Sequence, residues 1–147
     1  MTDLSRTFGK QSVDEQERER RIRRVFEAVA ARYDLMNDLM SMGIHRLWKR
    51  SLVRMAAPAP GQCIVDLAGG TGDVAALMAA PDRQVTVCDP SPAMMQVGRA
   101  RGHLHVQWLE GTAENMPLPP ASVDTVTIAF GIRNVTRIED ALAEVLR

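Results

Sequence analysis

The residues most able to do chemistry lie in two short stretches. "DLAGGTGD", from Asp66 to Asp73, follows the apolar run "CIV", and Asp89 ends a second run, "VTVCD". Gly70-Thr71-Gly72 with Ala75 fits the G-x-G-x-x-G/A turn, whose glycines let a ligand approach bare backbone. A carboxylate such as Asp89 can accept two hydrogen bonds from the vicinal diol of a ribose. The two stretches therefore predict a ligand that contains a nucleoside.

NAD and S-adenosylmethionine both contain such a diol, so the glycine turn and Asp89 leave two cofactors open. Asp66 favours S-adenosylmethionine. A carboxylate immediately before the turn would repel a pyrophosphate but attract the ammonium and sulfonium groups of S-adenosylmethionine. The methionine carboxylate could use free N–H groups at the helix start. An Asp66 that only caps the turn is the alternative without a ligand.

The elements that must position these residues alternate in the second part of the chain. Four apolar runs have strand length: 63–67, 84–88, 105–109 and 125–130. Helix-like segments at 73–80 and 91–101 separate the first three, and three prolines between 117 and 120 favour loop in the third connection. Alternating strands and helices predict an α/β fold with a doubly wound, mostly parallel sheet. The chain ends on another helical segment, "IEDALAEVLR".

Three helices are expected before this sheet. Ser12 and Glu15 fit a capping box at the start of the first. Gly43 ends the second, within "YDLMNDLMSMG", and the third runs from Ile44 to Ala56. At helical spacing, several apolar residues are expected to face inward: Ile22, Val25, Phe26, Val29, Leu47, Trp48, Leu52 and Met55. "PAPG" at 58–61 then divides an N-terminal helical lid region, 1–57, from the ligand-binding core, 58–147.

Composition limits the classes of function. The 147 residues are 46% hydrophobic and carry no net charge, which indicates a globular protein and argues against a general nucleic-acid binder. Residues 1–57 hold 12 Lys and Arg against 8 Asp and Glu, a slight surplus that would favour an anionic membrane surface. The sequence has neither a signal-like N-terminus nor a run of ~20 apolar residues. Cys63 and Cys88 lie in apolar runs, as reduced thiols of a cytoplasmic protein do.

Other residues give weaker indications of function. His45 has no partner visible in the sequence, which favours a helix-surface or packing role over general-base catalysis. The methionines at 36, 40 and 42 are expected to pack in the core or lid, although such side chains also suit a polyprenyl tail. No metal-ligand spacing occurs.

Three stretches together carry a family resemblance. "AARYDLMNDLMSMGIHRLWKR", "DLAGGTGD" and "IAFGIRNVT" resemble the ubiquinone/menaquinone biosynthesis C-methyltransferases, which are class I S-adenosylmethionine-dependent enzymes. The resemblance extends from about Phe8 to the last residue. Ala68, at the place of the first glycine of the generic turn, agrees with this family.

The resemblance implies a Rossmann-like class I methyltransferase fold with an N-terminal helical lid. It implies that the family chain continues after "EVLR" with a glycine-containing turn and three more strands, so this sequence is expected to be truncated after strand 4. Cofactor contacts are implied or inferred at the following positions: Asp66, Gly70, Thr71, Gly72, Asp89, Thr112, Ala113 and Ala129. Thr112 and Ala129 depart from the commoner Asn and Ser, which backbone contacts would survive.

The implied reaction transfers a methyl group from S-adenosylmethionine to a ring carbon of a polyprenylated benzoquinol or naphthoquinol. The site must align carbon, methyl and sulfur and must favour the phenolate. Arg133 is interpreted as stabilising the phenolate or ordering a water, because an arginine is a poor base. Asn134 would position the ring, and Tyr33 would be a third polar contact from the lid.

The resulting hypothesis is a cytoplasmic methyltransferase, with peripheral contact to the inner face of the membrane, and a homo-oligomer as one arrangement. Two other readings stay open. One is an NAD-dependent oxidoreductase, and the other is a non-catalytic fragment that at most binds a cofactor or a partner.

Overall fold

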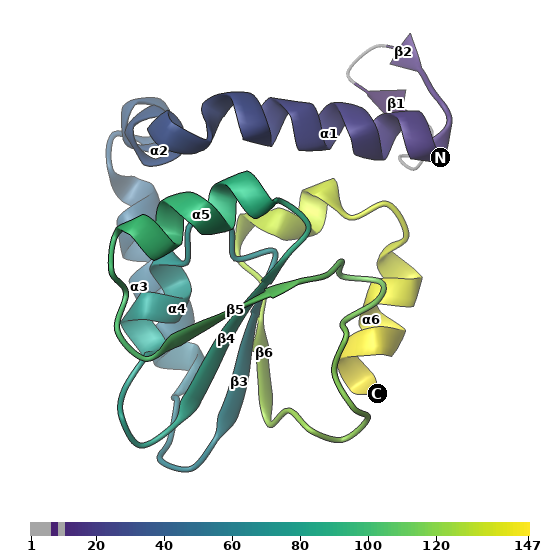
Figure 1. The fold of residues 1–147 in the computed structure, drawn as a ribbon. Coiled ribbons are helices and arrows are strands. Elements are labelled where there is room, and N and C mark those ends of the chain that lie inside the picture. The colour runs from purple at the N-terminus through teal and green to yellow at the C-terminus, as the bar shows by residue number, and fades with distance from the viewer. Residues whose placement is uncertain (1–6, 9–10) are drawn as a thin grey trace.

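A four-stranded parallel sheet forms the centre of the molecule. The computed structural model describes residues 7–8 and 11–147. The strand order is β5-β4-β3-β6, as Figure 1 shows. The strands span Cys63–Leu67 (β3), Gln84–Asp89 (β4), Val106–Glu110 (β5) and Thr125–Thr127 (β6). The predicted α/β fold with a parallel sheet is confirmed.

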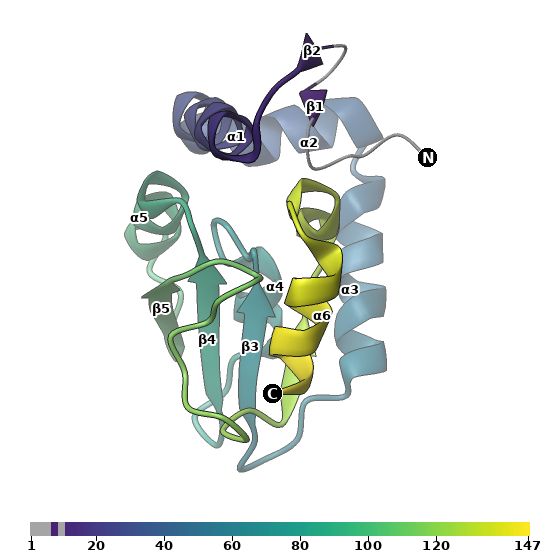
Figure 2. The ribbon, with the colours of Figure 1, turned by 90° about the vertical axis from the view of Figure 1, so that its right-hand side faces the viewer.

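Helices cover both faces of this sheet. On one face, α3 (Ile44–Ala56), α4 (Asp73–Met78) and α5 (Pro92–Ala100) pack on side chains such as Ile64 and Val85. On the other face, α6 (Ile138–Leu146) packs through Ala141 near Val65 and Leu67. Figure 2 shows α6 in front of the sheet and α4 behind it. Burial on both faces explains why β3 and β4 read as continuous apolar runs.

The fourth strand is shorter than its apolar run. The run 125–130 predicts six strand residues, but β6 ends at Thr127. β6 pairs with β3 only as far as Asp66, and β3 itself ends one residue later, at Leu67, before the glycine turn. The chain instead turns into a 3-10 helix, η3, over Phe130–Asn134. The third connection, 111–124, is loop without a helix, as its prolines predict.

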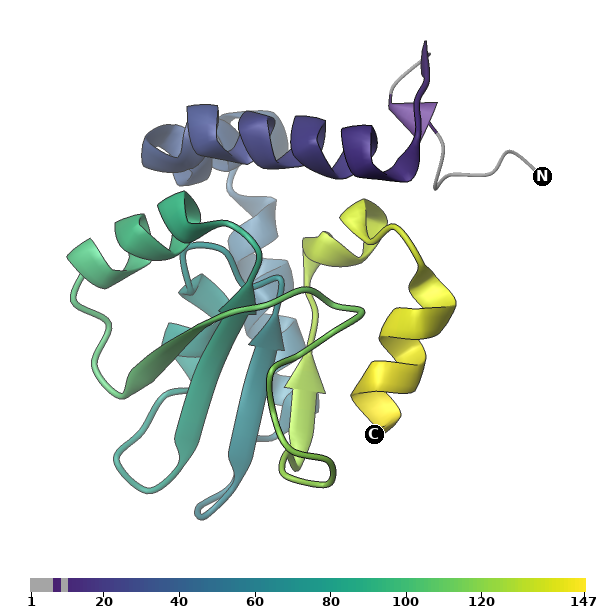
Figure 3. The same ribbon diagram turned by 45° about the vertical axis from the view of Figure 1, so that its right-hand side comes forward.

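The N-terminal region lies across the carboxyl ends of the strands. Two strands of two residues each, β1 (Thr7–Phe8) and β2 (Gln11–Ser12), pair antiparallel and lead into α1 (Glu15–Val29). A short 3-10 helix, η2 (Ala30–Arg32), joins α1 to α2 (Tyr33–Ser41). Figures 1 and 3 show α1 above α5 and above the yellow-green segment that contains η3.

The first helix begins differently from its prediction. Asp14, not Ser12, is its N-cap, and the Asp14 carboxylate accepts a hydrogen bond from the Glu17 N–H at 2.7 Å. Both Asp and Ser satisfy the free N–H groups of a first turn, so the cap chemistry alone could not decide between them. Ser12 instead pairs with Thr7 in the β1–β2 hairpin, so the extended segment continues through Ser12 and the helix begins only after Asp14.

Several side chains expected to face inward are exposed instead. Val25 of α1 is exposed, as are Leu47, Trp48 and Met55 of α3. The residues of α3 that contact the core are Leu52, Val53 and Ala56. In α2 and its cap, the three methionines expected to pack, Met36, Met40 and Met42, are also exposed. Helical spacing identifies an apolar face, but it does not say whether another element covers that face.

No helix among the described residues is both long and apolar enough to cross a bilayer.

Candidate functional site

The glycine turn wraps around the carboxyl group of Asp66. Gly70 and Gly72 have φ of +57° and +79°, a left-handed conformation that glycine adopts without strain. Gly69 is required for a different reason. A Cβ at Gly69 would lie 2.6 Å from Asp66 Oδ2 and 2.9 Å from the Asp66 carbonyl oxygen. The turn can therefore close over Asp66 only with glycine at position 69.

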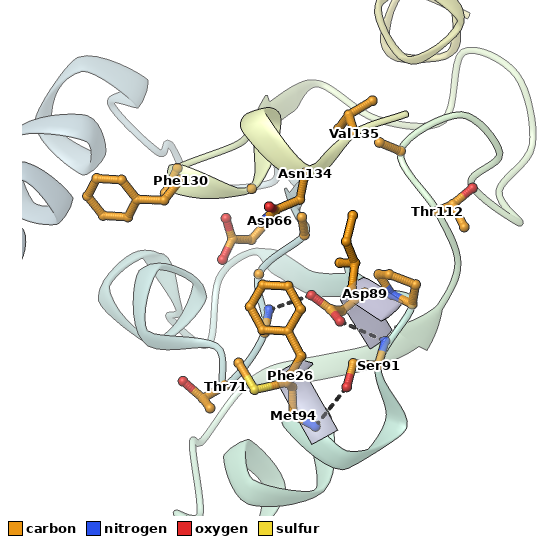
Figure 4. Close-up of a pocket in the computed structure, with 18 of the residues that line it drawn as sticks. Phe26, Asp66, Thr71, Asp89, Ser91, Met94, Thr112, Phe130, Asn134 and Val135 are labelled. Atoms are coloured by element: carbon orange, nitrogen blue, oxygen red, sulfur yellow. Dashed lines mark hydrogen bonds between the residues drawn. The ribbon is translucent and has the colours of Figure 1, made fainter. Parts of the chain in front are cut away.

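Asp89 connects this turn to the next helix. Its Oδ2 accepts a hydrogen bond from the Gly70 N–H at 2.9 Å, and its Oδ1 accepts one from the Ser91 N–H at 2.8 Å. Figure 4 marks both bonds. Burial raises the pKa of Asp89, and the two N–H donors oppose this shift. The carboxylate is thus held in one orientation, with lone pairs left for a ligand.

Asp66 is the more unusual of the two carboxyl groups, because only one of its oxygens has a partner. Oδ1 accepts a hydrogen bond from Thr127 Oγ1 at 2.9 Å. Oδ2 is buried and has no partner among the described residues. Burial raises the pKa of Asp66 to about 7, while the Thr127 hydrogen bond, the nearby Ala75 N–H and the charge of Lys49 act to lower it. A buried acceptor without a donor is costly, and it marks a place where a ligand can supply the donor.

Both carboxyl groups line one pocket between the sheet and the N-terminal helices. Figure 4 shows Asp66 and Asp89 together with Phe26, which comes from α1. Most of the residues predicted for the site are in this lining: Tyr33, Asp66, Gly70, Thr71, Asp89, Thr112, Ala113, Ala129 and Asn134. Segments far apart in the chain therefore converge where the sequence predicted a cofactor.

Two predicted site residues do not line this pocket. Gly72 lies behind the turn, where a Cβ would meet the Trp108 ring at 2.6 Å, so its role is close packing. Arg133 is exposed, and its guanidinium carbon lies 6.0 Å from the centroid of the Phe130 ring. Its neighbour Asn134 is the residue of "GIRN" that reaches the pocket. The catalytic role of Arg133 stays a prediction.

The pocket also contains residues that sequence reasoning did not assign to it. They are Glu19, Ile22, Arg23 and Phe26 of α1, Asn37 of α2, Lys49 of α3 and Met94 of α5, among others. The apolar period of α1 predicted the face that holds Ile22 and Phe26. Nothing local indicated that this face covers a ligand pocket rather than a packed core.

Polar contacts tie the N-terminal helices to the core on two sides of the pocket. Arg18 of α1 is buried, and its guanidinium donates to Thr136 Oγ1 at 3.0 Å and to the Asn134 carbonyl at 3.4 Å. On the other side, Arg101 forms ion pairs with Asp34 of α2 and with Asp73 of α4. These contacts hold α1 and α2 over the pocket.

His45 has a partner that the sequence did not reveal. Its Nε2 lies 2.7 Å from Asp38 Oδ1, and Asp38 also accepts from Arg46. Hydrogen bonds from Arg46 and His45 hold the pKa of Asp38 well below its usual range. His45 is buried and joins α2 to α3, away from the pocket lining. The packing interpretation is therefore the better one, and the partner is Asp38, seven residues earlier in the chain.

Comparison with known proteins supplies the family. The family model described as the ubiE/COQ5 methyltransferase family matches residues 13–147. The chain belongs to this family. The resemblance inferred from the three motifs is thereby confirmed.

Relatives of high identity share the family's name. UbiE, the ubiquinone/menaquinone biosynthesis C-methyltransferase of Rubrivivax gelatinosus, is 75% identical over 146 residues, which are 99% of this chain and 58% of that protein. UbiE of Paracoccus denitrificans is 48% identical over 147 residues, covering 95% of this chain and 59% of that protein. This member of the ubiE/COQ5 family thus spans somewhat more than half the length of the relatives it matches.

Solved structures agree on the fold. A putative methyltransferase from Haloferax volcanii, solved in complex with the activator Trm112, superposes with a TM-score of 0.66 at 25% identity, over 83% of this chain and 54% of that one. A putative S-adenosyl-L-methionine-dependent methyltransferase of Methanococcus maripaludis gives 0.67 at 16% identity, over 82% and 57%. The second likeness shows the fold alone. The predicted class I methyltransferase architecture is confirmed for this ubiE/COQ5 family member.

Proposed function

We propose that the pocket binds S-adenosylmethionine and that the protein transfers its methyl group to a ring carbon of a polyprenylated quinol. The observation that carries the proposal is the unpartnered, buried Oδ2 of Asp66 in a pocket that also holds Asp89. A ligand with a cationic end and a ribose diol suits the two carboxyl groups together. A pyrophosphate beside Asp66 would suit them less.

The residues present fit such a ligand. Asp89 would accept hydrogen bonds from the ribose hydroxyls, and Gly70 and Thr71 would let the ligand approach the backbone. Thr112, Ala113 and Ala129 would surround the nucleoside base with backbone contacts. When bound, S-adenosylmethionine supplies an electrophilic methyl group on its sulfonium. Residues of α1 and α2, the proposed lid within region 1–57, would exclude water from the site.

The acceptor side of the pocket is assigned to Asn134 and Tyr33, which would orient the quinol ring. Arg133 would have to turn inward from its place beside Phe130 to stabilise a phenolate. If it does so, Arg133→Lys keeps the charge but loses the planar fork, and methyl transfer from labelled S-adenosylmethionine should fall at unchanged cofactor affinity. Equal turnover of the Lys variant would exclude Arg133 from the reaction.

The proposed lid carries exposed apolar side chains on and next to α2. Leu39 and Met40 are exposed on α2, the helix whose Tyr33 and Asn37 line the pocket, and Met42 is exposed at its C-cap. We propose that this surface touches the membrane that holds a prenylated substrate. The chain should then float with vesicles of anionic lipid, and a Leu39→Ser/Met40→Ser variant should float less. Equal flotation of both proteins would contradict the membrane contact.

Cofactor binding is tested first, with calorimetry on the 147-residue chain. S-adenosylhomocysteine should bind, and NAD should not. Binding of NAD in preference would support the oxidoreductase reading, and binding of neither would refute the proposed function.

A further inference from the structure

Lys49 is the basic side chain at the Asp66 end of the pocket. It comes from α3, its side chain is 11% exposed, and its Nζ donates to Asp73 Oδ2 at 3.0 Å. Asp73 is its one hydrogen-bond partner among the described residues. An ammonium has three donors, so two remain for a ligand.

The other basic residue in the pocket lining is Arg23 of α1. Arg23 also borders a neighbouring depression formed with Glu110, the last residue of β5, and with Thr112 and Pro117, which follow β5. That is the side on which the nucleoside is proposed to lie. Lys49 is thus the cation placed to meet the opposite end of the ligand.

Lys49 and Asp66 are near enough to interact. The charge of Lys49 acts to lower the pKa of Asp66 against the effect of burial. Both side chains line the same pocket, and neither neutralises the other through a direct hydrogen bond. A negative and a positive group therefore face one space, each with unused hydrogen-bonding capacity.

We propose that Lys49 and Asp66 together bind the amino-acid end of S-adenosylmethionine, with Lys49 holding its carboxylate and Asp66 its ammonium. An α-amino acid carries both charges on substituents of a single carbon, which matches a pair of opposite charges side by side. Asp73 acts as a positioning residue, because its ion pair holds the Lys49 ammonium at the pocket wall. The proposal rests on the proposed function and adds a cofactor-binding residue outside the glycine turn.

The test removes the carboxylate from the ligand and the ammonium from the protein. Calorimetry would measure S-adenosylmethionine and its decarboxylated analogue against the 147-residue chain. The chain should prefer S-adenosylmethionine by roughly tenfold, as expected for a charge-assisted hydrogen bond. Lys49→Gln should lose most of this preference by weakening S-adenosylmethionine alone, and Lys49→Arg should keep part of it.

Arg50→Gln is the matched control, because Arg50 is exposed on the same helix and is not in the lining. It should leave both affinities unchanged. Equal binding of the two ligands by the unmodified chain would overturn the proposal without any variant. So would a Lys49→Gln protein that keeps the preference, a result that would direct Lys49 toward the acceptor ring. Failure of every adenosyl ligand to bind would instead refute the proposed function itself.

Discussion

Asp66→Asn should lower the affinity for S-adenosylmethionine and remove its dependence on pH between about 5 and 7. Burial raises the pKa of Asp66 to about 7, so the carboxyl group of the free protein is largely protonated at pH 6. An ammonium beside Oδ2 favours the ionised form, so binding at pH 6 should release a proton. The affinity should then rise with pH by up to about tenfold per unit until it levels off near pH 7.

The groups around Asp66 determine how the affinity for S-adenosylmethionine changes with pH. Thr127 does not titrate in this range. The charge of Lys49 lowers the pKa of Asp66, and the charge of Asp89 raises it. Burial raises the pKa of Asp89 as well, against the effect of its two N–H donors, so Asp89 contributes to the same curve and the Asp66→Asn variant isolates its share. Above about pH 8 the amino group of the ligand begins to lose its own proton, and the affinity should fall again. Calorimetry in two buffers of different ionisation enthalpy would count the released protons. An affinity that is constant with pH in the unmodified chain would contradict the ammonium contact.

Asp66→Asn should lower the cofactor affinity but raise the stability of the folded chain at high pH. The folded pKa of Asp66 lies above its unfolded value, so the unfolded chain binds fewer protons between about pH 4 and 7. The free energy of unfolding therefore falls as pH rises through this window. Asp66→Asn removes that loss, and thermal melting should show the variant as more stable than the parent at pH 8 and similar near pH 4. A variant less stable than the parent at pH 8 would contradict this prediction. It would mean that neighbouring groups compensate for the cost of burying the Asp66 carboxylate.

Asp89→Ala should weaken cofactor binding by about 1.5–3 kcal/mol, the range for hydrogen bonds that involve a charged group. That corresponds to a loss of affinity of roughly ten- to more than a hundredfold. Two effects contribute, because Asp89 would bind the ribose diol and already accepts from the N–H groups of Gly70 and Ser91. Calorimetry with S-adenosylhomocysteine measures the sum.

Two further proteins separate these effects. Asp89→Asn keeps one acceptor oxygen and should lose less affinity than the Ala variant. Asp82→Ala removes an exposed carboxylate that pairs with Arg83 just before β4, at the opposite end of that strand from Asp89, and the variant should bind as the parent does. Undiminished affinity of Asp89→Ala would remove Asp89 from the cofactor site.

Much of this site could be predicted from the sequence because its determinants are local. An apolar strand followed by closely spaced glycines can end only in a tight turn, and an acid at the end of the next parallel strand must lie at the same sheet edge. That reasoning placed Asp66, Gly70 and Asp89 together without coordinates. The helix Ile44–Ala56 and the strand Cys63–Leu67 likewise have the predicted bounds, because periodicity and flanking breakers mark them.

Other features depend on which element meets which, and that information is not local. The sequence could not show that Gly69 closes over Asp66, that Asp38 reaches His45 across a turn, or that "TVTIAF" pairs for only three residues. It also could not place the apolar face of α1 over a pocket or the side chain of Lys49 inside it. Helical spacing makes a face apolar or charged, but only tertiary packing decides what that face touches. For this protein the sequence determined the glycine turn and the two carboxylates at the ends of the strands. Only the tertiary structure placed α1 and Lys49 around the same pocket.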